Sequence, residues 1–256
     1  MNIVASIQAR MMSTRLPGKV LRELGGKPML LFQIERLKNC QHLNDVVVAT
    51  STNPADDDIA SLCSDHGIKY YRGSEDDVLG RVSNTVKEFG VDIHVECFGD
   101  SPLVDPELID SMIAMINTSS THIDIVTNCH HSSFPAGMEA YIYRSQCLSQ
   151  INSKVATNDP LREHCGFNLM LQRDKFTLIE VNASLEQHYP HLFLEVDELC
   201  DLEMLQNIHN YFMQMGKIDY RLDDIISAAK DRPELFEANR HVKRKWKDMR
   251  AMHHTK

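Results

Sequence analysis

The chain has 256 residues, of which 25% are charged and 43% hydrophobic, and its formal net charge is −9. This length can bury a full hydrophobic core, as one large domain or as one domain with a small appendage. The acidic balance argues against nucleic acid as a partner, and no apolar run approaches the roughly 18 residues that cross a membrane.

The N-terminus, MNIVASIQAR, has no basic region before its short apolar run. We interpret it as a first strand and not as a signal peptide, and we expect a cytoplasmic protein. The seven cysteines are scattered and never form a C-x-x-C pair. This pattern argues against a disulfide framework and a structural zinc site, so most cysteines are expected to be small buried residues.

Strand and helix patterns alternate along the first half of the chain. The expected strands are 3–7, 46–50, 68–71, 91–97 and 123–127, and the expected helices are 29–37, 54–63, 77–89 and 106–116. The run 46–50 is continuous and β-branched, which is typical of a strand buried on both faces. This rhythm with short connections predicts a largely parallel sheet between layers of helices.

The rhythm changes beyond about residue 130. The expected elements are strands at 138–143, 176–181 and 192–196, a helix at 161–172, and mostly helix from residue 198 onward. We expect this half to complete the same domain and to add a lobe over the carboxyl edge of the sheet. The last stretch, 231–256, is rich in Lys and Arg and is expected to be a solvated basic helical tail.

A loop rich in cations follows the first strand. Between residues 9 and 27 there is one acid, Glu23, and there are five cations: Arg10, Arg15, Lys19, Arg22 and Lys27. Ligands of open α/β sheets bind outside the carboxyl ends of the strands, and Arg and Lys both suit phosphate. The loop could hold a triphosphate; a surface loop with unpaired charge is the alternative. Neither the P-loop motif nor G-x-G-x-x-G is present.

Four motifs occur in order: A-R-M-M-S-T-R-L-P-G-K, LGGKPML, YRGSEDDVLGR and GDSPLVDPELID. With them the sequence resembles the cytidylyltransferase family of the spore-coat polysaccharide protein F type, and more distantly the enzymes that make CMP-Kdo and CMP-sialic acid. The resemblance runs from residue 3 to about 116 and weakly to about 205. It implies a nucleotide-diphospho-sugar transferase-like (GT-A-like) three-layer α/β sandwich with a mostly parallel sheet and a small second-half lobe.

The resemblance also implies how CTP is bound. Arg10, Arg15 and Lys19 would neutralise the β- and γ-phosphates and stabilise the departing pyrophosphate. Together with Asp100 they are the expected catalytic residues. The expected nucleotide-binding residues are Ala9, Arg10, Ser13, Arg15, Lys19, Arg72, Asp77, Arg81 and Asp100. A simpler interpretation makes Ser74 the cap of the next helix, with acids 75–77 at its positive end; it leaves Arg72 and Arg81 unexplained.

Mg²⁺ is the cofactor that the resemblance implies. Asp100 follows the strand 91–97, with Gly99 permitting an unusual turn, and Asp197 lies in V-D-E-L-C-D-L-E, which is similar to the family's V-D-T-P-E-D-L-E without its Thr and Pro. A magnesium ion typically takes one or two carboxylates and phosphate oxygens. The alternatives are that Asp100 caps a turn and Asp197 a helix. Asp56-Asp57-Asp58 also contains a D-x-D pattern, but its place at a helix start favours first-turn acids.

Acceptor-binding residues are implied in the second half. The stretch 133–139 aligns with the family's T-Y-P-x-G-L-D-V-E, with Glu139 replacing an Asp and Tyr141 standing where a Glu is usual. Arg162-Glu163-His164 matches a family R-E-H. Arg162 could clamp a carboxylate or phosphate of the acceptor, or it could pair structurally with neighbours of Glu163.

The resemblance therefore implies an enzyme that transfers CMP from CTP to a hydroxyl of an acidic sugar, of the 3-deoxy-octulosonic or nonulosonic type, for surface polysaccharide such as lipopolysaccharide. The cytidylyltransferase domain would span 1–230, with a nucleotide-binding part at about 1–127 and an acceptor and homodimer part at about 128–230. One alternative keeps the fold and changes the nucleotide, or changes the acceptor to a phosphorylated alcohol, sugar or phosphonate. Another is a non-catalytic nucleotide-binding protein.

Overall fold

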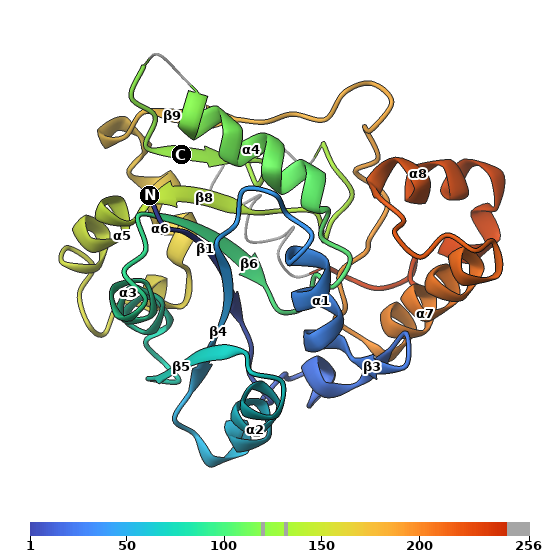
Figure 1. Cartoon of the computed structure of the whole chain (residues 1–256), viewed down its shortest axis with the longest axis horizontal. Helices are drawn as coiled ribbons and strands as arrows, with labels where there is room; N and C mark the ends of the chain where they lie inside the picture. The colour runs from blue at the N-terminus through green and yellow to red at the C-terminus, as the bar shows by residue number, and fades with distance from the viewer. Residues whose placement is uncertain (119–120, 131–132, 245–256) are drawn as a thin grey trace.

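The computed structural model describes residues 1–118, 121–130 and 133–244. Its centre is a seven-stranded sheet in the order β5-β4-β1-β6-β8-β7-β9, with helices on both faces (Figure 1). The strands are β1 (Ile3–Gln8), β4 (Asp45–Ser51), β5 (Lys69–Gly73), β6 (Ile93–Phe98), β7 (Ile125–Thr127), β8 (Tyr141–Arg144) and β9 (Leu178–Glu180). A separate two-stranded sheet pairs β2 (Glu23–Leu24) with β3 (Lys27–Pro28).

The sheet is mostly parallel. β1 pairs in parallel with β4 and β6, and Ile7 lies opposite both Val48 and Cys97. β8 is antiparallel to β6 and β7. The carboxyl ends of β1, β4 and β6 therefore meet at one edge, where the loop after β1 begins. The three-layer α/β fold with a mostly parallel sheet is confirmed.

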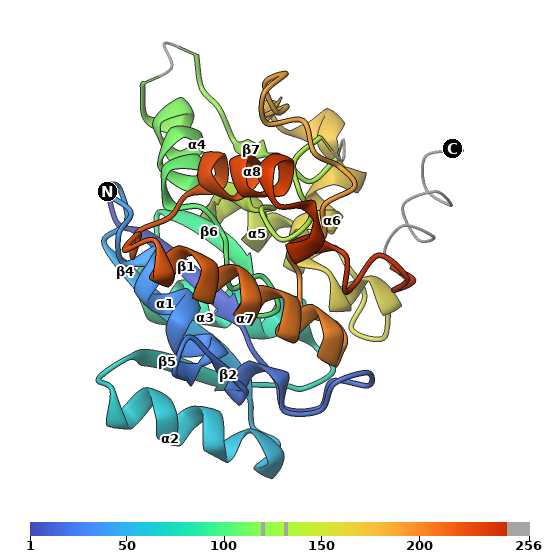
Figure 2. The ribbon, with the colours of Figure 1, turned by 90° about the vertical axis from the view of Figure 1, so that its right-hand side faces the viewer.

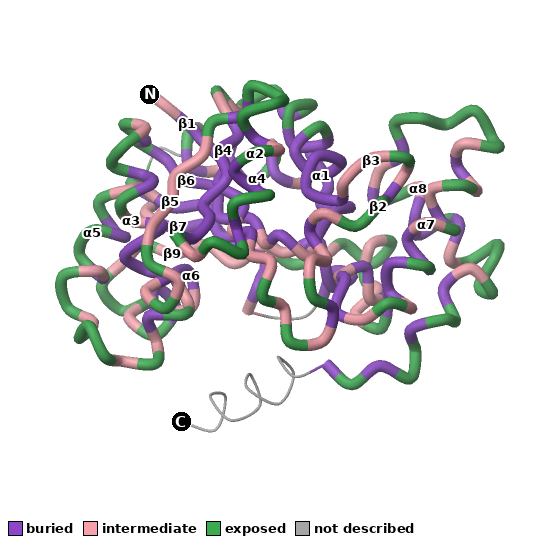
Figure 3. Tube along the Cα trace, turned by 90° about the horizontal axis from the view of Figure 1, so that it is seen from below, coloured by how far each residue is buried: buried purple, intermediate pink, exposed green. Residues whose placement is uncertain are grey.

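Successive side chains of β1 point to opposite faces of the sheet, as in any strand. They belong to two hydrophobic cores, one on each face. Ile3, Ala5 and Ile7 pack on one face with α1, α2, α4, α7 and α8, and Val4 packs on the other with α3, α5 and α6. The inner strands β1, β4, β6, β7 and β8 form the buried centre of the molecule (Figure 3). α7 and α8 form an outer layer beyond α1 (Figure 2). The helices are α1 (Met29–Leu37), α2 (Asp57–Asp65), α3 (Val78–Glu88), α4 (Pro106–Thr118), α5 (Ser145–Asn152), α6 (Cys165–Leu171), α7 (Leu199–Gln214) and α8 (Leu222–Asp231).

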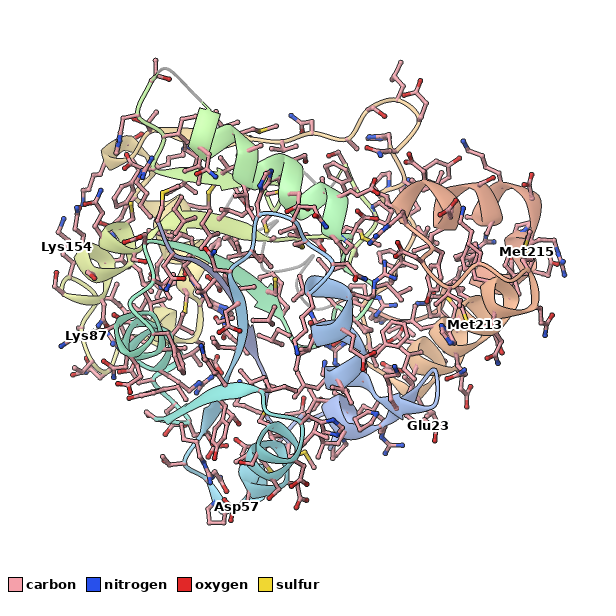
Figure 4. All side chains as sticks on the ribbon, viewed as in Figure 1. Glu23, Asp57, Lys87, Lys154, Met213 and Met215 are labelled. Carbon is pink, nitrogen blue, oxygen red and sulfur yellow. The ribbon has the colours of Figure 1, made fainter. Side chains whose placement is uncertain are left out.

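Polar side chains on the outer helices face away from the sheet, as Lys87 of α3 and Lys154 just after α5 show (Figure 4). The short 3-10 turns are η1 (Lys19–Leu21), η2 (Pro54–Asp56), η3 (Pro160–Glu163), η4 (Arg173–Lys175) and η5 (Pro233–Phe236). Among the described residues, none of the helices has the length and apolar character to cross a membrane. All seven cysteines are free thiols, and all except Cys200 are buried, as expected for small core residues.

Two second-half elements differ from the sequence-based expectation. The segment 192–196 is not a strand: Leu194 N–H bonds the carbonyl of Ala136 at 2.7 Å and Val196 N–H bonds the carbonyl of Asp100 at 2.8 Å, so it crosses between loops instead of joining a ladder. The expected helix 161–172 divides into η3 and α6, because the backbone of His164 is extended.

The C-terminal stretch also differs. Residues 245–256 of the expected tail lie outside the described residues. Residues 231–244 contain the end of α8 and the turn η5, and Arg244 is buried instead of solvated. The described part of this stretch therefore packs against the domain.

Candidate active site

A cavity of about 860 Å³ opens at the carboxyl edge of the sheet. Its walls come from the loop after β1, the end of β6 and the segment 160–167, and Asp197 completes the rim. Arg10, Ser13, Arg15, Lys19, Arg81, Asp100, His164 and Asp197, all predicted site residues, line this cavity. The chain thus brings most of the predicted residues to the place where open α/β sheets bind ligands.

Two cations and two carboxylates meet at the rim, and we call these four residues the edge cluster. Lys19 Nζ lies 3.0 Å from Asp100 Oδ2 and 3.5 Å from Asp197 Oδ1. Arg15 Nη2 lies 2.7 Å from Asp197 Oδ1. One ammonium therefore contacts both carboxylates, although they are far apart in sequence.

The loop carrying the cations is held in shape by a turn and by a buried acid. Gly18 adopts a left-handed conformation with φ of 69° directly before η1, and its N–H bonds the carbonyl of Met11 at 2.8 Å. Only glycine reaches this region without steric cost. Asp56 Oδ1 accepts the N–H of Met11 at 2.7 Å, and its Oδ2 accepts the hydroxyl of Ser51 at 2.5 Å. The D-x-D pattern therefore supplies a loop anchor in Asp56, while Asp57 begins α2 at the periphery (Figure 4).

Asp100 is placed by a close approach of two strand ends. A Cβ on Gly99 would lie 2.4 Å from the carbonyl oxygen of Gln8, so only glycine allows β6 to end against β1 here. The backbone of Gly99 is not left-handed, so close packing rather than an unusual turn explains this glycine. The bond from Val196 N–H to the Asp100 carbonyl then brings Asp197 to the same edge.

Several guanidinium N–H groups at the cavity remain available. Arg15 Nη1 and Arg81 Nε are buried without a hydrogen-bond partner among the described residues. Arg81 Nη1 donates to the carbonyls of Ser74 at 2.5 Å and Glu75 at 3.1 Å, and Arg10 Nη1 donates to Glu75 at 3.2 Å. Burial and the nearby Arg10 lower the pKa of Arg81. Buried donors without partners are costly, and an anion in the cavity would satisfy them.

Arg72 and Asp77 do not line the cavity. The Arg72 guanidinium donates to the carbonyl of Ser51 at 2.8 Å and pairs with Asp57 at 2.7 Å. Asp77 caps α3, the role predicted for Ser74, by accepting the N–H of Gly80 at 2.8 Å. The charges of both side chains are satisfied within the protein, and their nucleotide contacts stay a prediction. Ala9 is likewise buried, and its N–H bonds the carbonyl of Ala49 at 3.3 Å.

Of the predicted acceptor residues, Glu139 and Arg162 do not line the cavity, whereas His164 does. Arg162 is 5% exposed and binds Asp77 through Nε at 2.7 Å and Nη2 at 2.9 Å, so it is a structural pair, with Asp77 and not with a neighbour of Glu163. Burial would raise the pKa of Asp77, but the bonds from Arg162 and Gly80 lower it overall. Glu139 accepts the N–H of Gly137 at 2.6 Å away from the cavity.

His164 is the acceptor residue that does line the cavity. Burial lowers the pKa of its imidazole, although the nearby Glu163 opposes this. Burial therefore favours the neutral imidazole, which can accept a hydrogen bond.

Glu96 is a cavity residue that was not among the predicted site residues. It is 2% exposed, and it accepts hydrogen bonds from Gln8 Nε2 at 3.0 Å and from the Tyr143 hydroxyl at 2.9 Å. Burial raises its pKa to about 7, against the opposing effect of these hydrogen bonds and of the Gly166 N–H. We call Gln8, Glu96 and Tyr141, which all line the cavity, the cavity floor. An acid inside a predicted apolar strand, four residues before Asp100, was the available signal.

The edge cluster suits a divalent cation. No group of three or more His, Cys, Asp or Glu side chains within the described residues could hold a metal by itself. Mg²⁺ instead takes one or two carboxylates and completes its shell with substrate phosphates and water. Asp100 and Asp197 form such a pair, and the shared ammonium of Lys19 shows that positive charge is stabilised between them.

A protein-family model and several known proteins are similar to this chain. A family model described as cytidylyltransferase matches residues 4–150. The spore coat polysaccharide biosynthesis protein SpsF of Bacillus subtilis is 29% identical over 212 residues, 81% of this chain and 86% of that protein. A 3-deoxy-manno-octulosonate cytidylyltransferase of Geobacter sulfurreducens is 40% identical over 116 residues, 44% of this chain and 45% of that protein.

A solved structure extends the similarity over nearly the whole chain. The structure of a cytidylyltransferase from Leptospira borgpetersenii serovar Hardjo-bovis matches with a TM-score of 0.86 and 30% identity, and covers 95% of this chain and 100% of that one. The match extends beyond residue 150, where the family model ends.

Proposed function

The chain belongs to the cytidylyltransferase family, and from this premise we propose that it transfers CMP from CTP to a hydroxyl of an acidic sugar and releases pyrophosphate. The observation that carries the proposal is the edge cluster, in which Arg15 and Lys19 contact the carboxylates of Asp100 and Asp197 at one cavity rim. A site with cations and a pair of carboxylates at one rim suits a metal–triphosphate.

We propose that Arg10, Arg15 and Lys19 bind the phosphates of CTP. Arg15 Nη1 has no partner among the described residues, so it can donate to a phosphate oxygen without losing an existing bond. Lys19 adds a compact positive charge. Because negative charge accumulates on the departing pyrophosphate, preorganised cations stabilise the transition state more than the ground state.

We propose Mg²⁺ as the cofactor, held by Asp100 and Asp197. The ion would supply Lewis acidity at the α-phosphate and a lower pKa for the attacking hydroxyl. The protein contributes the alignment: Gly99 and the Val196–Asp100 backbone bond fix the two carboxylates at one edge. Neutral His164 lines the same cavity and is able to accept the proton of an acceptor hydroxyl.

The acidic-sugar acceptor is supported by the relative named 3-deoxy-manno-octulosonate cytidylyltransferase, and a role in surface polysaccharide by the relative SpsF. Arg162 is already paired with Asp77, so we propose Arg81, which lines the cavity, as the partner of the acceptor carboxylate. A homodimer through the second half remains a prediction that size-exclusion chromatography with light scattering would test.

A pyrophosphate-release assay tests this proposal. It would cover CTP, UTP, ATP and GTP against 3-deoxy-manno-octulosonate, a nonulosonate, a phosphorylated alcohol and a phosphonate. We expect turnover with CTP and a sugar acid; turnover only with a phosphomonoester would retire the acidic sugar. Asp100→Asn should abolish turnover while CTP binding is largely kept, and unchanged turnover would remove the metal role.

A further inference from the structure

A short C-terminal segment crosses the start of α7 beneath the edge cluster. We call residues 237–244 the strap. Its last residue, Arg244, has a side chain that is 1% exposed, with Nη2 at 2.6 Å from Asp201 Oδ1 and Nη1 at 3.2 Å from Asp201 Oδ2. The guanidinium also lies over the ring of Phe193, 4.9 Å from its centroid. A long cationic side chain at the end of a polar segment is thus one of the most buried groups of the molecule.

A second strap residue reaches the same carboxylate. Asn239 Nδ2 donates to Asp201 Oδ1 at 2.8 Å and to the carbonyl of Phe193 at 2.9 Å. Asp201 is 0% exposed. Burial would raise its pKa, but hydrogen bonds from Arg244 and from two backbone N–H groups lower it overall. The strap therefore ends on a buried, ionised acid and not on the protein surface.

Asp201 in turn holds the backbone of the edge cluster. Its Oδ2 accepts the N–H of Asp197 at 2.9 Å and the N–H of Glu198 at 2.8 Å. Glu198 and not Asp197 is the N-cap of α7, so the Asp197 side chain is free to face the cavity. A hydrogen-bonded path runs from Arg244 through Asp201 to the main chain of Asp197.

Arg244 also approaches the Asp197 carboxylate itself. Its Nη1 lies 3.7 Å from Asp197 Oδ2 and 3.6 Å from Glu195 Oε1. The other oxygen of Asp197 contacts Arg15 and Lys19. The carboxylate is therefore held between cations from the two ends of the chain. Without Arg244, the carboxylates of Glu195, Asp197 and Asp201 would lose the guanidinium that lies close to all three, which favours displacement of one of them.

We infer that Arg244 is a positioning residue of the active site, which acts through Asp201 to fix the orientation of Asp197 toward the metal–CTP complex. This inference rests on the proposed role of Asp197. It makes the strap a part of the site, although the strap does not line the cavity. Partners that orient a metal ligand from behind typically change metal affinity by ten- to a hundredfold when they are removed.

A mutant cycle on the full-length chain tests the inference. Binding of Mn²⁺ to the CTP-loaded protein, followed by electron paramagnetic resonance of the free ion, would be measured for the wild type, Arg244→Ala, Asp197→Asn and the double variant. Arg240→Ala is the matched control, because Arg240 belongs to the strap but is exposed and pairs with Glu237, at 2.7 Å. Arg244→Lys and Asn239→Ala are milder variants for the case in which Arg244→Ala does not fold.

We expect Arg244→Ala, or the milder variants to a smaller extent, to weaken Mn²⁺ binding by about tenfold or more, while Arg240→Ala leaves it unchanged. The loss should disappear in the Asp197→Asn background, because the two changes act on one contact path. An equal loss in both backgrounds, or a lower melting temperature with unchanged Mn²⁺ affinity, would overturn the inference alone. Asp197→Asn with wild-type Mn²⁺ affinity would overturn the proposed metal site as well.

Discussion

The edge cluster and the cavity floor hold negative charge in opposite ways. At the edge, the carboxylates of Asp100 and Asp197 share the ammonium of Lys19. At the floor, the single carboxyl of Glu96 has hydrogen-bond donors but no cation among its described partners, and burial raises its pKa to about 7. At the edge, another cation can therefore replace Lys19 as the partner of the two carboxylates. At the floor, Glu96 favours a bound group that is neutral or that donates a hydrogen bond.

Removing the shared cation would test the edge most severely. We expect Lys19→Ala to lower kcat by about a thousandfold, because the departing pyrophosphate loses a fixed charge and the two carboxylates lose their common partner. Pyrophosphate release under saturating CTP measures the effect. Lys27→Ala is the control, since Lys27 pairs with Glu35 on the surface at 2.5 Å; an equal loss in both variants would remove the special role of Lys19.

Arg162 belongs to neither the edge cluster nor the cavity floor, and we expect its role to be structural. Arg162→Ala should lower the free energy of unfolding by about 3 kcal/mol, because it leaves Asp77 without its buried partner and frees the bonds to Asn152 and Val155. Urea unfolding measures this loss. If the variant instead kept its stability and lost only affinity for an acceptor, Arg162 would be a substrate clamp after all.

The floor predicts a specific pH dependence of stability. Because the pKa of Glu96 is about 7 in the folded protein and 4.5 ordinarily, the folded state keeps a proton that the unfolded state loses between these values. The contribution of Glu96 to the free energy of unfolding therefore falls as the pH rises from about 4.5 to 7 and is constant above that.

Glu96→Gln should abolish this dependence. Relative to the wild type, its free energy of unfolding should rise between pH 4.5 and 8 by about 3 kcal/mol at most. Denaturant titrations at a series of pH values measure the difference between the two proteins. Parallel curves over the whole range would mean that Glu96 is ionised in the folded state as readily as in the unfolded chain.

The smallest expected effect concerns Arg72, which lies outside both parts. Arg72→Ala should cost about 1 kcal/mol of stability, because the Asp57 carboxylate with which it pairs is exposed and its hydrogen bond to the Ser51 carbonyl contributes little net stability. Its affinity for CTP, measured by calorimetry, should stay within about twofold of the wild type. A tenfold loss of affinity would restore the nucleotide contact that the sequence suggested.

The edge cluster and the Arg162–Asp77 pair differ in how far the sequence predicts them. The cations of the loop and Asp100 follow strands whose carboxyl ends must meet at one edge, so topology alone places them together. No such rule places Arg162. Its partner Asp77 is 85 residues away, and a sequence motif does not show with which acid Arg162 pairs.

The strap and the segment before α7 were harder still to predict. Arg244 lies in a polar stretch without apolar periodicity, and only the fold reveals the buried acid that it meets. The apolar residues at 192–196 favoured a strand, but their backbone groups bond loops at Ala136 and Asp100. In both cases the segment binds residues that are distant in sequence, and no repeating sequence pattern indicates these contacts.

A crystal structure of the protein with CTP and Mn²⁺ tests the central claim most directly. We predict an anomalous-scattering peak that contacts the carboxylates of both Asp100 and Asp197, with Lys19 moved from between them onto a phosphate. A peak bound elsewhere, or a triphosphate that lies outside the edge cluster, would contradict the account.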